Sequence, residues 1–508
     1  MKTIAIGVFG ALVLFLISLF NIENLPLLWD EGWTLTVART WVEHGFYGRL
    51  LMGAPAPPGL EAAFPVTASV ALSFRLFGVG IWQGRLVGVI YLLATVALMY
   101  YLARRLYDHP VALGTIGVLF FMSPHLAMHP LFLARLVLAE IPMLFFLLAG
   151  YAFFLNALRQ SLGFVFLAIL FWGLALVTKA QTLPFWIASL GVPLVLTIMR
   201  RQWRVVGYLT LALVGSWIAS RLWLALQELA LQGHTMSPTP IVGLYDVTAF
   251  VPLGAVRVDA LMTLLVVGVP TLLGIGHTGW RWFNSENVWS RLDEITIVRL
   301  ALWGLAASWF AWFTFFSVGW IRYFFPATFV GSLFVAATLA DWSRHFAWRG
   351  TFVRACDAFR RLHFDSPGLG AILAILLVSI FVPVTCLQLF RAYTASDSSA
   401  VAVARWLNTQ TARNAVIESY ESELFFLLDR DYHYPPDQTN VEILRHSLPG
   451  GTTVPYAYDA FAANPDYLVV GTVGRESGLY DRVLASNTFR LVCTIGGYDI
   501  LSRCVEVP

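Results

Sequence analysis

Long apolar runs separated by short polar segments recur along most of this chain. A helix that crosses a bilayer needs about 20 predominantly apolar residues, and on that criterion the sequence predicts about eleven membrane spans. They are expected at 4–20, 82–103, 111–124, 137–156, 163–178, 183–199, 205–226, 258–276, 298–316, 324–340 and 369–390. The first is expected to remain as a span, because no small-residue cleavage site follows it.

Composition supports a polytopic α-helical membrane protein and excludes an ordinary soluble one. Hydrophobic residues make up 58% of the 508 positions and charged residues only 12%, whereas soluble proteins carry about 25% charged residues. The chain has four cysteines and no CxxC pair, so the sequence indicates neither a disulfide framework nor a CxxC metal site.

The basic residues predict an orientation, because they gather in alternate loops. The positive-inside rule assigns that side to the cytoplasm. The basic segments are Arg104-Arg105, Arg159, Arg200 to Arg204, Arg281 to Arg299 including Arg291, and Arg344 to Arg361. We therefore expect a multi-pass protein of the plasma (inner) membrane, with a cytoplasmic N-terminus and an extracytoplasmic region after residue 390.

Three segments on the predicted outer side are long. Residues 21–81 hold an acidic motif and a possible amphipathic surface helix over Phe64–Phe77. Residues 227–257 mix polar residues with Pro238, Pro240 and Pro252, as is typical of a mobile loop near a substrate entrance. The predicted division is a membrane domain over 1–390 and a soluble α/β domain over 391–508.

The α/β prediction for the tail depends on short apolar runs bounded by turn residues. Strands are expected at Ala415–Ser419, Tyr467–Gly471, Phe489–Ile495 and Tyr498–Val505, with helices ending near Leu407 and lying near Glu421–Arg430 and Val441–Leu448. An exterior location permits a disulfide between Cys493 and Cys504. A two-residue turn at Gly496-Gly497 would instead place Cys493 opposite Ile500, about four residues from Cys504 at roughly 3.4 Å each. The sequence leaves this bridge open.

Asp30 and Glu31 are the first candidates for chemistry, because acidic side chains are costly beside hydrocarbon. Trp29 and Trp33 flank them, as is typical of the membrane interface. Adjacent residues on a helix point about 100° apart, so one of the two acids is expected to face a substrate. We predict Asp30 as a general base and Glu31 as its structural support or a metal ligand. The alternative is a pair of solvated carboxylates at a helix end.

Three further positions carry charge at the outer ends of predicted spans. Glu140 begins the fourth long run; it is either a second acid near Asp30 or the ion-pair partner of Arg135. Lys179 follows an apolar run, and Arg322-Tyr323 precedes another. An ammonium and a guanidinium suit a lipid phosphate, whereas simple interfacial anchoring is the alternative for both.

Other signals point away from metal and nucleotide chemistry. His125 and His129 have the i, i+4 spacing of helical metal ligands, but Pro124 and Pro130 flank them, which favours a loop role. No Gly-rich phosphate loop, GxSxG or HExxH occurs where it could act. No cofactor is indicated with certainty, a divalent metal remains an option, and no nucleic-acid partner is expected.

Several short motifs, taken in order, resemble the GT-C superfamily of polytopic glycosyltransferases. The resemblance is to the dolichyl-phosphate-mannose protein mannosyltransferase and lipid A aminoarabinose transferase families. The motifs are Trp29 to Gly32, Pro57 to Leu60, Leu76 to Gly78, Gly84 to Leu86, Tyr101 to Leu106, Ser123-Pro124, Gly173 to Lys179 and Arg322 to Pro326. The chain departs from the pattern at Ala56, Glu140 and Ala180-Gln181, where relatives usually carry His or Lys, Asp, and Gly-Pro.

The resemblance implies an inverting transfer of a sugar from a polyprenyl-phosphate carrier to a lipid, glycan or protein hydroxyl on the outer face. It assigns catalytic roles to Asp30, Glu31 and Glu140, and lipid-phosphate binding to Lys179, Arg322, Tyr323 and Arg135. Two other readings fit the same composition: a transporter or flippase of lipid-linked sugars, and a non-catalytic protein of envelope-glycan assembly. Neither is favoured, because no internal repeat is evident and the polar residues gather at one face.

Overall fold

Each predicted membrane span coincides with a helix in the computed structural model, which describes residues 2–237, 241–284, 292–361, 366–449, 456 and 458–504. Among the described residues, eight helices are long and apolar enough to cross a membrane, and shorter apolar helices accompany them. The protein is thus a multi-pass membrane protein. Four residues that enter the sequence predictions, Pro238, Pro240, Arg291 and Val505, lie outside the described residues.

The helices of the bundle follow the predicted order, and most of their ends differ from the predicted ones by a few residues. They are α1 (Lys2–Leu19), α4 (Ile81–Leu106), α5 (His109–Phe121), α7 (Glu140–Arg159), α8 (Gly163–Thr178), α9 (Thr182–Met199), α10 (Trp203–Ala230), α12 (Gly254–Thr263) continuing through η2 (Leu264–Gly268) into α13 (Val269–Phe283), α15 (Glu294–Phe315), α16 (Phe325–Ser343) and α18 (Ser366–Thr394). Short helices between them are η1 (Leu126–Met128), α6 (Pro130–Ala134), α11 (Leu244–Thr248), η3 (Ile321–Phe324) and α17 (Trp348–Arg361).

Two helices, α7 and α16, lie at the centre of the bundle. The most apolar window of α7 is 83% buried, and that of η3 with α16 is 89% buried, against 22% for the peripheral α10. A helix that is apolar all round, as α7 is, belongs in the interior of a bundle. Glu140 at the start of α7 and Arg322 just before α16 therefore lie at the ends of central helices.

The long segment between α1 and α4 folds into structure of its own. It contains α2 (Trp29–His44), an antiparallel hairpin of β1 (Arg49–Leu51) and β2 (Ala54–Ala56), and α3 (Phe64–Phe77). The bounds of α3 are those predicted, and the helix exposes the apolar side chains of Leu72, Leu76 and Phe77. Its buried Val66, Val70 and Phe74 pack against α2 and Phe426, because these partners offer apolar area that a solvated loop lacks.

The tail forms the predicted small α/β unit. Its described residues build a five-stranded sheet in the order β4-β3-β5-β7-β6, with β3 parallel to β4 and β5 and the other pairs antiparallel. The elements are α19 (Ser399–Gln410), β3 (Val416–Ser419), α20 (Ser422–Leu427), β4 (Asp431–His433), α21 (Asp437–Ser447), β5 (Tyr467–Val470), α22 (Thr472–Ser477), α23 (Asp481–Ala485), β6 (Phe489–Ile495) and β7 (Tyr498–Arg503). The strand β4 was not predicted, because its three residues are too few for an alternating pattern.

The register of the β6–β7 hairpin shows how far apart Cys493 and Cys504 lie along their strands. Cys493 pairs with Ile500, as the two-residue turn predicts. Cys493 and Cys504 are both described and both are free thiols. The spacing expected from the turn is therefore right, and these two cysteines are not bridged.

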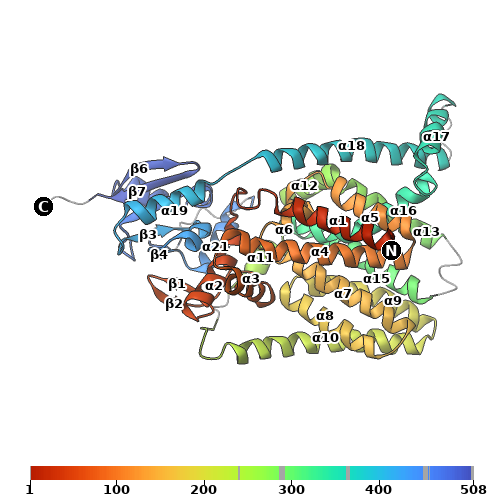
Figure 1. Ribbon diagram of the computed structural model, residues 1–508, viewed down its shortest axis with the longest axis horizontal. Helices are drawn as coiled ribbons and strands as arrows, with labels where there is room; N and C mark the ends of the chain where they lie inside the picture. Colours follow the sequence, from red (N-terminus) through yellow and green to blue (C-terminus); the bar gives the residue numbers. More distant parts are fainter. Residues whose placement is uncertain are drawn as a thin grey trace.

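Figure 1 shows how the parts are arranged. The sheet of the tail lies at one end of the helix bundle, with α2, α3 and the β1–β2 hairpin next to it. The N-terminus and α17 lie at the opposite end, and α18 runs along the outside of the bundle to reach the tail. The segment between α1 and α4 and the tail thus gather at one end, and the orientation of that end in the membrane remains a prediction.

Candidate active site

The acidic motif begins helix α2, whose first turn contains both Asp30 and Glu31. Carboxylates are favourable there, because the first turn of a helix carries unpaired N–H groups and the positive end of its dipole. The Glu31 carboxylate also accepts a hydrogen bond from the Leu28 backbone at 3.4 Å. The helical geometry turns the two acids toward different partners, as the 100° separation predicts.

Glu31 is held by Arg85 of α4 in a fully buried ion pair. Two parallel hydrogen bonds join the guanidinium to the two carboxylate oxygens, each at 2.8 Å, and both side chains have no exposed area. Arg85 also donates to the carbonyls of Ile22 and Leu25 in the segment after α1. Glu31 therefore ties α2 to the bundle, which is the supporting role among those predicted for it.

Asp30 faces a charged cluster assembled from distant parts of the chain. It forms an ion pair with Arg322, whose Nε lies 3.3 Å from the Glu140 carboxylate. The Lys179 ammonium lies 2.8 Å from the same Glu140 oxygen. The aromatic ring of Tyr323 lies 5.3 Å from that ammonium, within cation–π range. The charged cluster consists of these five residues: Asp30, Glu140, Lys179, Arg322 and Tyr323.

Exposure separates the members of the charged cluster into two layers. The Glu140 side chain is only 4% exposed, whereas those of Asp30, Arg322 and Lys179 are 35%, 21% and 17% exposed. Glu140 is thus the buried member of the cluster, and its carboxylate holds Arg322 and Lys179 in position. Asp30 and the cations remain open to a ligand, so the arrangement can bind an anion beside a carboxylate.

Arg135 lies apart from the charged cluster. Its Nε donates to the Ser18 carbonyl at 3.0 Å, and its guanidinium lies 4.6 Å over the ring of Tyr393. The alternative of an Arg135–Glu140 ion pair is therefore wrong. The reason is that Arg135 follows the end of α6, whereas Glu140 opens α7 and already has two cationic neighbours.

The two histidines act as caps of short helices, in keeping with the predicted loop role. The Nδ1 of His125 accepts from Ala127 before η1, and that of His129 accepts from Leu131 before α6. Burial lowers the pKa of His129 to about 4, so its ring is neutral and its Nε2 donates to the Phe120 carbonyl at 3.0 Å. Across the described ranges, no three His, Cys, Asp or Glu residues come together as a metal site.

The contact between the tail and the acidic motif has no signal in the sequence. The Trp29 indole donates to the Tyr420 carbonyl at 2.6 Å, and the Ser422 hydroxyl donates to the Trp29 carbonyl. Gly32 lies so close to α20 that a Cβ there would overlap the backbone of Ser422 and Glu423. The tail therefore rests directly on the residues that flank Asp30.

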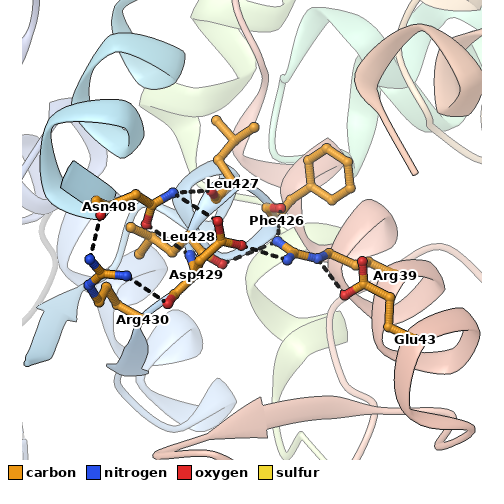
Figure 2. A network of polar contacts seen from close by, with 8 residues as sticks. All are labelled: Arg39, Glu43, Asn408, Phe426, Leu427, Leu428, Asp429 and Arg430. Atoms are coloured by element: carbon orange, nitrogen blue, oxygen red, sulfur yellow. Dashed lines mark hydrogen bonds and ion pairs between the residues drawn. The ribbon is translucent and has the colours of Figure 1, made fainter. Parts of the chain in front are cut away.

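The contact between α2 and the tail continues along the helix, as Figure 2 shows. Arg39 donates to the carbonyls of Phe426 and Leu428 at 2.8 and 3.1 Å, and it pairs with Asp429 at 2.8 Å. On the other side of the same turn, Asn408 donates to the Leu427 carbonyl at 3.1 Å. The bonds of Arg39 thus join α2 to the last turn of α20, and the bond of Asn408 joins that turn to α19.

Substituting Gly32 tests this close approach. Gly32→Ala is expected to push α20 away from α2, because the neighbouring backbone has no room for a methyl group. Hydrogen–deuterium exchange over residues 422–427 should become faster by at least tenfold. Gly117→Ala on α5 is the control, since a Cβ there meets nothing within 4 Å. Unchanged protection of α20 in Gly32→Ala would show that the contact does not depend on this glycine.

Comparison with known proteins agrees with the fold and with the motifs. The fold matches ArnT from Cupriavidus metallidurans, in a crystal structure bound to undecaprenyl phosphate, with a TM-score of 0.63, 16% identity, and coverage of 99% of this chain and 98% of that one. It also matches the oligosaccharyltransferase of Archaeoglobus fulgidus in its apo form, with a TM-score of 0.53, 12% identity, and coverage of 99% and 75%. Among curated protein sequences, none matches the chain.

The fold is accordingly that of ArnT, a multi-helix membrane bundle with a C-terminal mixed-sheet domain. Residues 64–223 match the family described as dolichyl-phosphate-mannose-protein mannosyltransferase. The sequence match is confined to those residues, and the likeness in fold to ArnT extends over nearly the whole chain. The resemblance predicted from the short motifs is confirmed.

Proposed function

We propose that the protein is an inverting glycosyltransferase that moves a sugar from a polyprenyl-phosphate carrier to an acceptor hydroxyl at the outer face of the membrane. The observation that carries the proposal is the charged cluster, in which one carboxylate and two cations are open together at the end of a GT-C bundle. The related structure of ArnT bound to undecaprenyl phosphate supports a polyprenyl-phosphate donor. The acceptor is a lipid, a glycan or a protein.

The chemistry of such a donor suits the two cations. The leaving group is a phosphate that is already anionic at neutral pH, so its departure needs stabilisation of charge more than protonation. Arg322 offers a planar fork for phosphate oxygens, and Lys179 offers a point charge beside it. Glu140 holds both cations in place from below.

Asp30 supplies the complementary step on the acceptor. An acceptor hydroxyl is a weak nucleophile, and a positioned carboxylate raises its reactivity by taking its proton during attack. The oxygen then bonds to the anomeric carbon while the bond from that carbon to the phosphate oxygen breaks. A single displacement of this kind inverts the anomeric centre.

The Arg322–Asp30 ion pair suggests how donor binding prepares the base. Arg322 is shared between Asp30 and Glu140. A phosphate that takes Arg322 as its partner releases the Asp30 carboxylate, which can then accept the proton of the acceptor. The base would therefore become available only when a donor is bound.

The experiment that tests the function is a transfer assay with the purified protein. Radiolabelled polyprenyl-phosphate sugars are incubated with the protein and a membrane extract, and the labelled product is isolated. Transfer of label from the carrier to an extract component, with release of polyprenyl phosphate, is the expected result. Movement of intact labelled carrier across a vesicle membrane without transfer would instead support a flippase.

Lys179→Gln tests the phosphate site independently of transfer. Loss of one charge-assisted hydrogen bond is expected to weaken the binding of undecaprenyl phosphate by about 10- to 100-fold, measured by titration calorimetry in detergent. Arg135→Gln is the comparison, because Arg135 lies with Ser18 and Tyr393 and should leave the affinity unchanged. Weaker binding by Arg135→Gln, with unchanged binding by Lys179→Gln, would show that the phosphate binds at Arg135 and not at Lys179.

A further inference from the structure

A second cavity with charged walls lies at the end of the bundle that is away from the charged cluster. Its volume is about 430 Å³, and its walls come from the turn after α4 and from α5, α13, α15 and α16. Cavities of about 300–1,000 Å³ are typical of small-ligand sites. Asp341 in its wall lies on α16, which begins at Phe325, so at 1.5 Å per residue the two are roughly 24 Å apart along the helix. Figure 1 shows α17 and the N-terminus at this end, so the cavity is separate from the site proposed for transfer.

Two arginines, one histidine and two aspartates line this second cavity. Arg281 of α13 forms an ion pair with Asp341, whose side chain is 41% exposed. His345 lies 3.7 Å from Asp108, which also caps the start of α5. Arg299 of α15, by contrast, has no carboxylate within ion-pair distance among the described residues. The walls therefore carry an excess of basic side chains and one cation that no described acid neutralises.

Arg299 is placed so that an anion in the cavity can reach its charge. Its guanidinium lies 4.1 Å over the ring of Tyr107, and the side chain as a whole is half-buried and lines the cavity. A guanidinium stacked on a ring still presents N–H donors at its edge, where they match the oxygens of an anion. Its Nε is buried without a hydrogen-bond partner among the described residues. Because a partly buried charge without a counter-charge is costly, an anion in the adjoining cavity would stabilise Arg299.

The segment that brings His345 to the cavity has an unusual backbone. Arg344, His345 and Phe346 follow one another with φ of +53°, +58° and +62°, a left-handed conformation that residues other than glycine seldom adopt. The His345 N–H donates to the Ala340 carbonyl at 2.7 Å, and the Phe346 ring fills the space beside Gly114 of α5. Backbone strain of this kind persists where the surroundings fix it, and it gathers at functional sites. It leaves the His345 side chain in the cavity wall and 72% exposed, so the cavity is open to a ligand.

We propose that this cavity binds a phosphate group, with Arg299 as its main partner and with Arg281 and His345 as further donors. A guanidinium offers paired N–H groups to two phosphate oxygens, and an imidazole N–H can donate to a third. Arg281 reaches the phosphate by exchanging its partly exposed partner, Asp341, for the ligand. The phosphate belongs either to the head group of a membrane lipid or to a small soluble compound. The proposal does not depend on the proposed function, since none of its residues belongs to the charged cluster.

Arg299→Gln tests the proposal by direct binding. The full chain in neutral detergent is titrated with short-chain phosphatidic acid and, separately, with inorganic phosphate. Every protein compared also carries Lys179→Gln, which weakens phosphate binding at the charged cluster. Loss of one charge-assisted hydrogen bond should weaken the binding of at least one probe by about 10- to 100-fold. Arg204→Gln is the matched control, because Arg204 also lies over a tyrosine ring, that of Tyr208, but is exposed outside the cavity.

Asp341→Asn tests the same cavity in the opposite direction. The substitution removes a negative charge from the wall and releases Arg281 for the ligand. Phosphate binding should become about 2- to 5-fold tighter, the effect of freeing one partly exposed ion pair. Damage to the fold lowers affinity and does not raise it, so this gain separates a phosphate site from a purely structural role of these side chains.

The two probes identify the source of the phosphate. If Arg299→Gln weakens the binding of phosphatidic acid alone, the ligand is a lipid head group. If it weakens the binding of inorganic phosphate, with or without that of the lipid, a soluble phosphate is sufficient. The proposal is overturned if neither probe binds, if Arg299→Gln binds both probes as tightly as its parent, or if Arg204→Gln loses as much affinity. Unchanged or weaker binding by Asp341→Asn would also overturn it, because this carboxylate would then not compete with the ligand for Arg281.

Discussion

Replacing Asp30 with asparagine is expected to lower the rate of sugar transfer by about 100- to 10,000-fold, the usual contribution of a general base. Asparagine keeps the shape of the side chain and removes its ability to accept a proton. Because the substitution also releases Arg322 from its ion pair, undecaprenyl phosphate should bind at least as tightly as before. Initial rates with a radiolabelled donor and calorimetric titration with undecaprenyl phosphate measure the two effects.

The combination of lost transfer and retained phosphate binding distinguishes a catalytic base from a residue that holds the donor. Glu43→Gln is the matched control on the same helix, since Glu43 belongs to a partly exposed pair with Arg39, and such pairs contribute little to stability. Full transfer by Asp30→Asn would remove Asp30 as the base. Loss of both transfer and phosphate binding would mean that Asp30 organises the phosphate site instead.

The largest effect on stability is expected from Arg85→Ala. The substitution leaves the Glu31 carboxylate fully buried without its partner, and breaking a buried ion pair in this way costs about 3–5 kcal/mol. Thermal unfolding in detergent should show a markedly lower transition temperature. Transfer should fall as well, because α2 carries both Glu31 and Asp30.

The paired variant Glu31→Gln with Arg85→Met should recover most of the lost stability, since no uncompensated charge remains. Arg75→Ala is the comparison: Arg75 is exposed on α3 and lies 5.7 Å over the ring of Trp41, so its loss should have little effect. If Arg85→Ala were as stable as Arg75→Ala, the pair with Glu31 would not be what holds α2 to the bundle.

Features that depend on a local pattern could be predicted from the sequence alone. Apolar runs predict the spans because the bilayer imposes a length on each of them. The α3 helix and four strands of the tail also follow from periodicity and turn residues. The charges at the outer ends of separate runs could be assigned to one end of the bundle, which is why Asp30, Lys179 and Arg322 were predicted as parts of one site.

Contacts between distant segments could not be predicted in the same way. Glu31 was left with several roles because its partner, Arg85, lies 54 residues away and is itself inside an otherwise apolar run. Arg135 was predicted either as the ion-pair partner of Glu140 or as part of the phosphate site, and its contacts with Ser18 and Tyr393 could not be foreseen, because both residues are distant in sequence. The contact of Tyr420 with Trp29 has no local pattern at all.

That contact has a consequence for the order in which the protein is made. Trp29 and Tyr420 are 391 residues apart, so at about 5–20 residues per second the ribosome needs roughly 20–80 s between them. Glu31 and Arg85 can pair early in that interval, whereas the face of α2 around Gly32 has no packing partner until α20 has been synthesised. A nascent chain would therefore carry Asp30, the proposed base, long before this contact could form, and activity would require synthesis to continue beyond α20.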